Sequence, residues 1–150
     1  MVNSSLILGA QSMERLKLSP EQFFDGLLAA IRLKTSVIEG EPTSVHRAFF
    51  RVLKELPKNS VLEVDLFDVD YDPLYGQSGW FDRALTTAQR DAVVGFSNPS
   101  YNKITIKYTS QEGQTILKAL AVQPAVDEFE RLAGIFTQSL ESAQVRRSSF

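Results

Sequence analysis

The fold is decided by residues 79–120, GWFDRALTTAQRDAVVGFSNPSYNKITIKYTSQEGQTILKAL. Apolar residues recur at its start with the spacing of a helix, about 100° per residue, and predict a helix over residues 79–94. They are Phe81, Ala84, Leu85, Ala88 and Ala92. Ser78 is a suitable N-cap, and Gly95 stands where a glycine commonly ends a helix. The stretch therefore begins with an amphipathic helix that buries one face.

A β-hairpin and a second helix are predicted to follow. Turn-forming residues fill positions 97–100, and residues 103–108 alternate and are rich in β-branched side chains, which indicates a strand. Residues 95–108 are therefore interpreted as a two-stranded ribbon. Thr109 and Glu112 have the spacing of a capping box, which starts a helix over residues 109–120. Gly113 lowers helix propensity by roughly 1 kcal/mol relative to Ala, so we expect it to permit close packing.

The residues AL…AVVGF…ITIKYTSQEGQTIL resemble the prokaryotic winged-helix pattern. In that pattern a recognition helix is followed by a hairpin, called the wing, and by a helix that starts at Tyr-x-Leu-Thr-x-x-Gly. This chain keeps Tyr108, Thr109 and Gly113 and lacks the leucine between the tyrosine and the threonine. Residues 71–78, YDPLYGQS, are similar to the Tyr-Gly-Pro-x-Ser approach to the third helix in small antitoxin-like winged-helix proteins, although the proline here precedes Gly76. The resemblance covers residues 43–120 and implies a winged-helix fold that binds nucleic acid or protein.

Polar side chains of the helix over residues 79–94 form a candidate DNA-reading face. If the apolar stripe packs inward, four side chains face out together: Arg83, Thr86, Thr87 and Arg90. Arginine contacts guanine edges or phosphates, and short hydroxyl side chains allow close approach to a base. The alternative is an ordinary solvated helix face, and Asp82 and Asp91 reduce its positive charge.

The hairpin supplies candidate contacts to the phosphate backbone, namely Asn102, Lys103 and Lys107. Together with the helix face they predict a double-stranded DNA site in a winged-helix transcriptional regulator. The alternative for the lysines is protection of an edge strand from aggregation.

Helices are predicted on both sides of this stretch. Ser19, Pro20 and Gln22 form a clear helix start, and that helix is expected over residues 20–33. A linker is expected over 39–42, a helix capped by Thr43 or Ser44 over 44–56, a strand over 61–69, a helix over 125–142 and a frayed tail over 144–150. Residues 6–8 are interpreted as a short strand or a packed arm.

The first and last of these helices carry wide apolar stripes. In MarR-like winged-helix proteins a first helix of this kind often serves dimerisation, so the resemblance favours a homodimer. The alternative is burial of both stripes within one chain.

The acidic segment, residues 63–72, offers a second functional hypothesis. Its carboxylates would attract a basic protein partner, as expected of an adaptor-like or antitoxin-like winged helix that does not bind DNA. Asp68, Asp70 and Asp72 also have the spacing of the first three ligands of a calcium loop. Pro73 and Gly79 occupy the positions of the glycine and the glutamate that such a loop requires, so no metal site is predicted.

Composition limits the function classes. Hydrophobic residues make up 43% of the 150 residues, which suffices for a core, and the net charge of −2 means that any DNA contact needs a local basic patch. The absence of cysteine excludes disulfides and thiolate metal sites. His46 is the only histidine and has no partner motif, so a packing or surface role is expected. No catalytic residue, cofactor or enzymatic activity is predicted.

No signal peptide and no apolar run of membrane-spanning length is recognised, so a cytoplasmic location is expected. The predicted architecture is one α+β domain over residues 1–150, a helix-rich winged helix with a small antiparallel wing. Its core is expected over residues 43–120, with helical extensions over 19–38 and 124–143.

Overall fold

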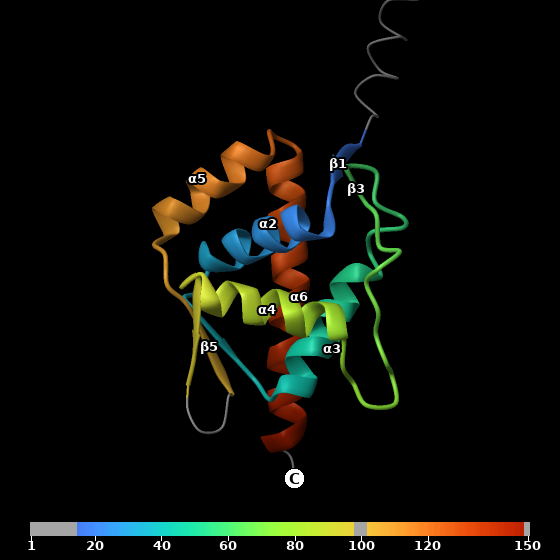
Figure 1. Ribbon diagram of the computed structural model, residues 1–150, viewed down its shortest axis with the longest axis vertical. Coiled ribbons are helices and arrows are strands. Elements are labelled where there is room, and N and C mark those ends of the chain that lie inside the picture. Colours follow the sequence, from blue (N-terminus) through green and yellow to red (C-terminus); the bar gives the residue numbers. More distant parts are fainter. Residues whose placement is uncertain (1–14, 98–101, 149–150) are drawn as a thin grey trace, which may run out of the picture.

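The computed structural model describes residues 15–97 and 102–148. This part of the chain has an α+β fold with five helices (Figure 1). The described elements are β1 (Leu16–Leu18), α2 (Pro20–Arg32), β2 (Val37–Glu39), α3 (Pro42–Leu53), β3 (Leu62–Val64), α4 (Gly79–Arg90), β4 (Val94–Phe96), β5 (Lys103–Ile106), α5 (Ser110–Leu120) and α6 (Ala125–Ser148). The α+β prediction is confirmed, and residues 6–8 lie outside the described residues.

Two small sheets connect the helices. β2, β5 and β4 form an antiparallel sheet in that spatial order, with Ile38 opposite Ile104 and Val94 opposite Ile106. These four side chains are buried, so the sheet turns one face to the core. β1 and β3 pair in parallel, with Leu18 opposite Val64.

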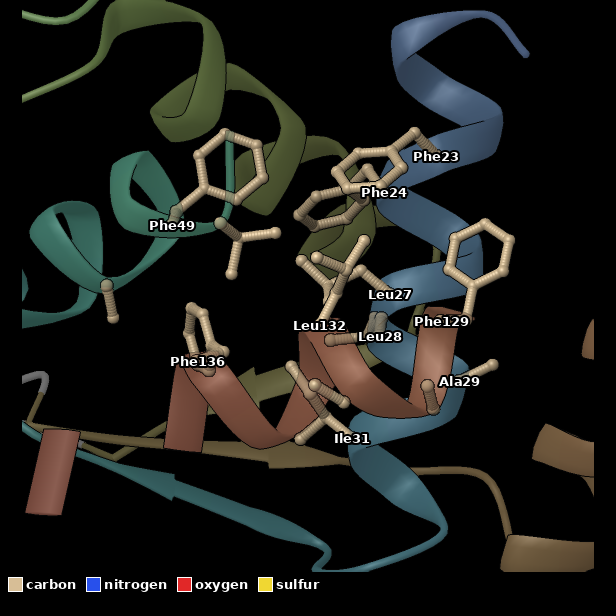
Figure 2. Packing of buried hydrophobic residues seen from close by; sticks show 14 of the residues in the cluster. Phe23, Phe24, Leu27, Leu28, Ala29, Ile31, Phe49, Phe129, Leu132 and Phe136 are labelled. Atoms are coloured by element: carbon tan, nitrogen blue, oxygen red, sulfur yellow. The ribbon is translucent and has the colours of Figure 1, made fainter. Parts of the chain in front are cut away.

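The helix α2 lies at the centre of the core. It packs on both α5 and α6, and α3 packs on α6 (Figure 1). Figure 2 shows labelled side chains of α2, α3 and α6 gathered in one buried cluster. Phe24 of α2 lies edge-on to Trp80 and Phe81 of α4. The rings of Phe23 and Phe129 stack with their centres 5.8 Å apart. Each fully buried phenylalanine contributes roughly 1.5–3 kcal/mol, so this cluster is a main source of stability.

The wide apolar stripes of the first and last helices are buried within the chain. On α6 the stripe consists of Val126, Phe129, Leu132, Ala133, Phe136 and Leu140, all of them buried. Burial within one chain is therefore the correct interpretation of the stripes, and they no longer indicate a dimer. The homodimer itself stays a prediction. No helix in the described ranges is long and apolar enough to cross a bilayer.

Both predicted capping boxes are confirmed. The Ser19 hydroxyl accepts the Gln22 N–H at 3.1 Å, and the Gln22 side chain accepts the Ser19 N–H at 2.9 Å. Thr109 and Glu112 make the same pair of bonds, at 3.1 and 3.0 Å. A Cβ atom at Gly113 would lie 3.1 Å from the Ala29 carbonyl oxygen, so the expected close packing of this glycine is also confirmed.

Several predicted bounds are wrong. The expected strand over 61–69 is limited to β3, and the expected linker over 39–42 contains the end of β2 and the start of α3. The N-cap of α3 is Glu41, not Thr43 or Ser44, because Pro42 takes the first helical position, where its fixed φ suits a helix. The last helix continues to Ser148 and so includes most of the predicted tail.

The end of α4 also differs from the prediction. The helix stops at Arg90, and Ala92 takes the left-handed conformation with φ 61°. Gly95 belongs to β4, where it lies opposite Thr105. The strand register requires Val94 opposite Ile106, so the helix must end several residues earlier than the glycine suggests.

Candidate nucleic-acid interface

Two side chains satisfy the first N–H groups of α4. The Ser78 hydroxyl accepts the Phe81 N–H at 3.1 Å, which confirms Ser78 as the N-cap. The Asp70 carboxylate accepts the Gly79 N–H at 3.1 Å and the Trp80 N–H at 2.9 Å. The bond from Trp80 is the main cause that lowers the pKa of Asp70 below its ordinary value. Asp70 is therefore an anionic cap at the positive end of the helix.

His46 ties the start of α4 to α3. Its Nδ1 accepts the backbone N–H of Ser78 at 2.9 Å, and its ring packs edge-on against Phe81 with the ring centres 4.9 Å apart. Burial lowers the pKa of His46, and the carboxylates of Asp82 and Asp70 oppose that change. Of the packing and surface roles expected for His46, the structure shows packing, and the histidine also positions α4.

The four polar side chains of the predicted reading face are all exposed: Arg83, Thr86, Thr87 and Arg90. The opposite face of α4 is buried and consists of Trp80, Phe81, Leu85 and Ala88. Phe81 stacks on Phe49 of α3 with the ring centres 4.2 Å apart, which fixes the rotation of α4 about its axis. The predicted outward orientation of the four side chains is therefore confirmed.

Carboxylates lie close to both arginines of this face. Arg90 pairs with Asp91 at 3.8 Å, and both side chains are mostly exposed. A Cβ at Gly79 would lie 3.1 Å from Asp70 Oδ2 and 3.3 Å from Arg83 Nη1, so these two charges flank the same backbone position. The exposed Arg90–Asp91 pair contributes about 0–1 kcal/mol, so a phosphate could displace it. The hydroxyl of Thr86 is already engaged, because Thr86 Oγ1 donates to the Asp82 carbonyl at 2.9 Å.

A hollow beside α4 adds further acids. It lies between α2 and α4, has a volume of about 340 Å³, and is lined by Arg83 and Thr87 together with Glu21, Asp25 and Asp91. Burial raises the pKa of Asp25, and the nearby charge of Glu21 raises it further. This flank of the predicted reading face is therefore electrostatically mixed.

The hairpin residues are exposed, as predicted: Asn102, Lys103 and Lys107. Lys103 lies opposite Glu39 in the sheet and pairs with it at 3.6 Å. The side chain of Lys107 lies over Gly95, because a Cβ atom added at Gly95 would be 3.0 Å from Cε of Lys107. Residues 98–101 are outside the described residues, so most of the predicted turn over 97–100 is not described.

The carboxylates of the acidic segment mostly serve the chain itself. Glu63 pairs with Arg15 at 2.9 Å, and Asp65 and Asp72 accept backbone N–H groups of their own turns. Asp70 caps α4, so this carboxylate of the segment lies at the start of the helix that carries the predicted reading face. No group of three or more potential ligand side chains in the described ranges could hold a metal ion.

The aromatic residues in the first turn of α4 and in the segment before it have different environments. Tyr71 stacks on Phe50 with the ring centres 4.0 Å apart, and Trp80 stacks on Phe49 at 6.1 Å. These two side chains anchor the segment to α3. Tyr75, by contrast, is 68% exposed.

Comparison with protein-family models, curated proteins and solved structures finds no match to this chain. The sequence interpretation missed Asp70 and His46 as the residues that position α4. The only local signal for Asp70 was its place in a turn shortly before a helix start, and no local signal joins His46 to Ser78.

Proposed function

We propose that this chain is a winged-helix protein. The order helix, strand, helix, helix, hairpin of α2, β2, α3, α4 and β4–β5 supports this, as does the sheet order β2-β5-β4. A helix-turn-helix unit has a short turn between its two helices. Here residues 54–78 connect α3 to α4, and this longer connection carries β3 and the acidic segment.

We further propose that α4 is a recognition helix of a DNA-binding transcriptional regulator. The observation that carries the proposal is the joint exposure of Arg83, Thr86, Thr87 and Arg90 on a helix whose other face is fixed in the core. An α-helix fits the major groove, where arginine is the commonest reader of guanine. The hairpin lysines would contact the backbone beside it.

Salt dependence tests the proposal. If each subunit neutralises four phosphates, the binding constant falls with a logarithmic slope of about −3.6, which is roughly a 150-fold loss between about 50 and 200 mM salt. Fluorescence anisotropy with a labelled random duplex measures that slope. The double variant Arg83→Glu/Arg90→Glu should halve it, to about −1.8.

A matched control carries the same change of charge on another face. Arg47 and Arg51 are exposed on α3 and line the hollow between α3 and α6. The double variant Arg47→Glu/Arg51→Glu should keep the slope of the unmodified protein. Equal slopes for the two double variants would show that the α4 face does not hold DNA.

The acids around α4 favour a second candidate function, a winged-helix module that binds a basic protein. Phe67 in the acidic segment supports it, because this side chain is 91% exposed between Asp65 and Asp68. Aromatic residues surrounded by charge are common at protein-binding hot spots. In this case the chain would show no DNA binding at low salt.

Affinity purification distinguishes this candidate. The tagged chain should recover a basic partner, and the variant Phe67→Ser/Asp68→Lys should lose it. Leu74→Ser is the control, because Leu74 is 81% exposed but lies outside the acidic segment. Recovery that is indifferent to both variants would exclude this surface.

A further inference from the structure

A second hollow lies on the other flank of α4. It has a volume of about 350 Å³ and opens between the start of α3, α4 and the sheet. Val45, Leu85 and Ile104 form its apolar wall, and all three are buried. Its polar side chains include His46 and Asp82. Volumes of this size and a mixture of apolar wall with few polar groups are typical of small-molecule sites.

His46 presents a hydrogen-bond donor to this hollow. Its Nδ1 accepts the Ser78 N–H, so the neutral ring carries its proton on Nε2. His46 is only 6% exposed, and no described residue accepts a hydrogen bond from Nε2. Within the described ranges, no fully buried side-chain nitrogen lacks a partner, so Nε2 must reach an accessible surface. His46 is one of the residues that line this hollow, so we infer that Nε2 faces it.

Asp82 presents an acceptor to the same hollow. Its side chain is exposed, and its charge is close enough to His46 to act on the histidine pKa in the raising direction. The carboxylate disfavours phosphates and other anions in the hollow. A fitting ligand therefore has an apolar body, an acceptor for the histidine N–H and a donor for the carboxylate.

We propose that this hollow binds a small heteroaromatic ring that carries an amino group beside a ring nitrogen. The ring nitrogen would accept from His46 Nε2–H, and the amino group would donate to Asp82. The apolar wall formed by Val45, Leu85 and Ile104 would cover the ring. This arrangement is present on adenine, which offers an amino donor next to ring-nitrogen acceptors. The inference does not depend on DNA binding, because its ligand is a free small molecule.

Adenine is the probe, and purine, which lacks the amino group, is the matched control ligand. Isothermal titration of the full chain should show saturable adenine binding at or below about 1 mM, the range of a weak but specific small ligand. Loss of a hydrogen bond to a charged group costs about tenfold or more in affinity, so purine should bind at least that much more weakly. Equal affinity for both compounds, or no saturation with adenine, would overturn the proposal.

Two variants locate the site. Asp82→Asn should weaken adenine binding by about tenfold or more while purine binding stays the same. Asp91→Asn makes the same substitution beyond the other end of α4, outside this hollow, and should leave adenine binding unchanged. Because both aspartates are exposed, both variants should fold. Amide chemical shifts should change around Leu85 and Phe96, and changes centred on Asp25 instead would refute the location.

Discussion

The substitution Gly26→Ala tests the packing of α2 against α6. A Cβ at residue 26 would lie 2.5 Å from both Cε1 and Cζ of Phe129, about 1 Å closer than ordinary contact. Phe129 is fully buried and stacked on Phe23, so its ring has little room to move. Overpacking of this kind costs typically about 1–3 kcal/mol, and we expect the upper end because two ring atoms overlap.

The helix propensity of alanine opposes this cost. Alanine is better than glycine by about 1 kcal/mol in a helix interior, so the net destabilisation is about 2 kcal/mol. For a chain of this size that corresponds to a fall of about 4–8 °C in Tm. Urea unfolding followed by circular dichroism, together with a thermal melt, measures both quantities.

Gly134→Ala is the matched control, since Gly134 is also within a helix. A Cβ there would meet only the flexible Lys34 Nζ, at 3.1 Å, so the propensity gain should persist and stability should rise by up to about 1 kcal/mol. A double-mutant cycle of Gly26→Ala with Phe129→Leu should show coupling of about 1–2 kcal/mol, because the leucine removes the overlapping ring atoms. Purely additive effects, or a more stable Gly26→Ala variant, would refute the packing argument.

Three further predictions concern buried or capping polar groups. Asn59→Ala should cost about 3 kcal/mol in urea unfolding, because Asn59 Oδ1 accepts the N–H groups of Val61 and Leu62 and both would lose that partner. Because the pKa of His46 is lowered in the folded state, the neutral ring adds to the free energy of unfolding. That contribution is complete above about pH 6.5 and is lost as the pH falls below this value. His46→Asn, which keeps an acceptor, should lack this acid-dependent loss in melts at pH 5–7. Because the pKa of Asp70 is lowered in the folded state, its carboxylate stabilises the fold above about pH 4, and this stabilisation is lost in more acidic solution. Asp70→Asn should lack this acid-dependent fall in Tm in a series of melts. It should also lower the free energy of unfolding by about 1 kcal/mol at pH 7.

Local signals in the sequence predicted the starts of α2, α4 and α5 correctly, whereas α3 starts earlier than predicted, at Pro42. In a capping box the acceptor and donor are three residues apart, as at Ser19 and Gln22, so the sequence contains the whole interaction. The burial of α4 was also predictable, because its apolar period is a property of the helix alone. The outward orientation of Arg83 and Arg90 follows from the same period.

Long-range pairings could not be predicted in the same way. β2 has three residues, too few for a periodic pattern, and its partner β5 lies more than 60 positions further along the chain. The end of α4 at Arg90 depends on that sheet, because the register of β4 decides where the helix must stop. The contact of His46 with Ser78 depends on the packing of α3 against α4, so the sequence around either residue does not indicate it.

The position of Asp70 relates the stability of α4 to what its outer face can bind. A helix needs acceptors for its first N–H groups, and a carboxylate meets that need and complements the helix dipole. The same charge flanks Gly79 together with Arg83, so it opposes the field that a DNA phosphate requires there.

This opposition is local to one end of the helix. The Debye length is about 10 Å at 0.1 M salt, whereas the 12 residues of α4 span about 18 Å. Salt therefore screens Arg90, at the far end of the helix, from the charge of Asp70. Arg83, near the start of the helix, is not screened in this way. Asp91 pairs with Arg90 only as an exposed ion pair, which a phosphate can replace. DNA contact is therefore best supported at the end of α4 that leads into the hairpin, and a basic partner at the end that Asp70 caps. Charge reversal at Arg90 alone should then weaken DNA binding more than charge reversal at Arg83 alone, and the opposite order would favour the protein-binding function.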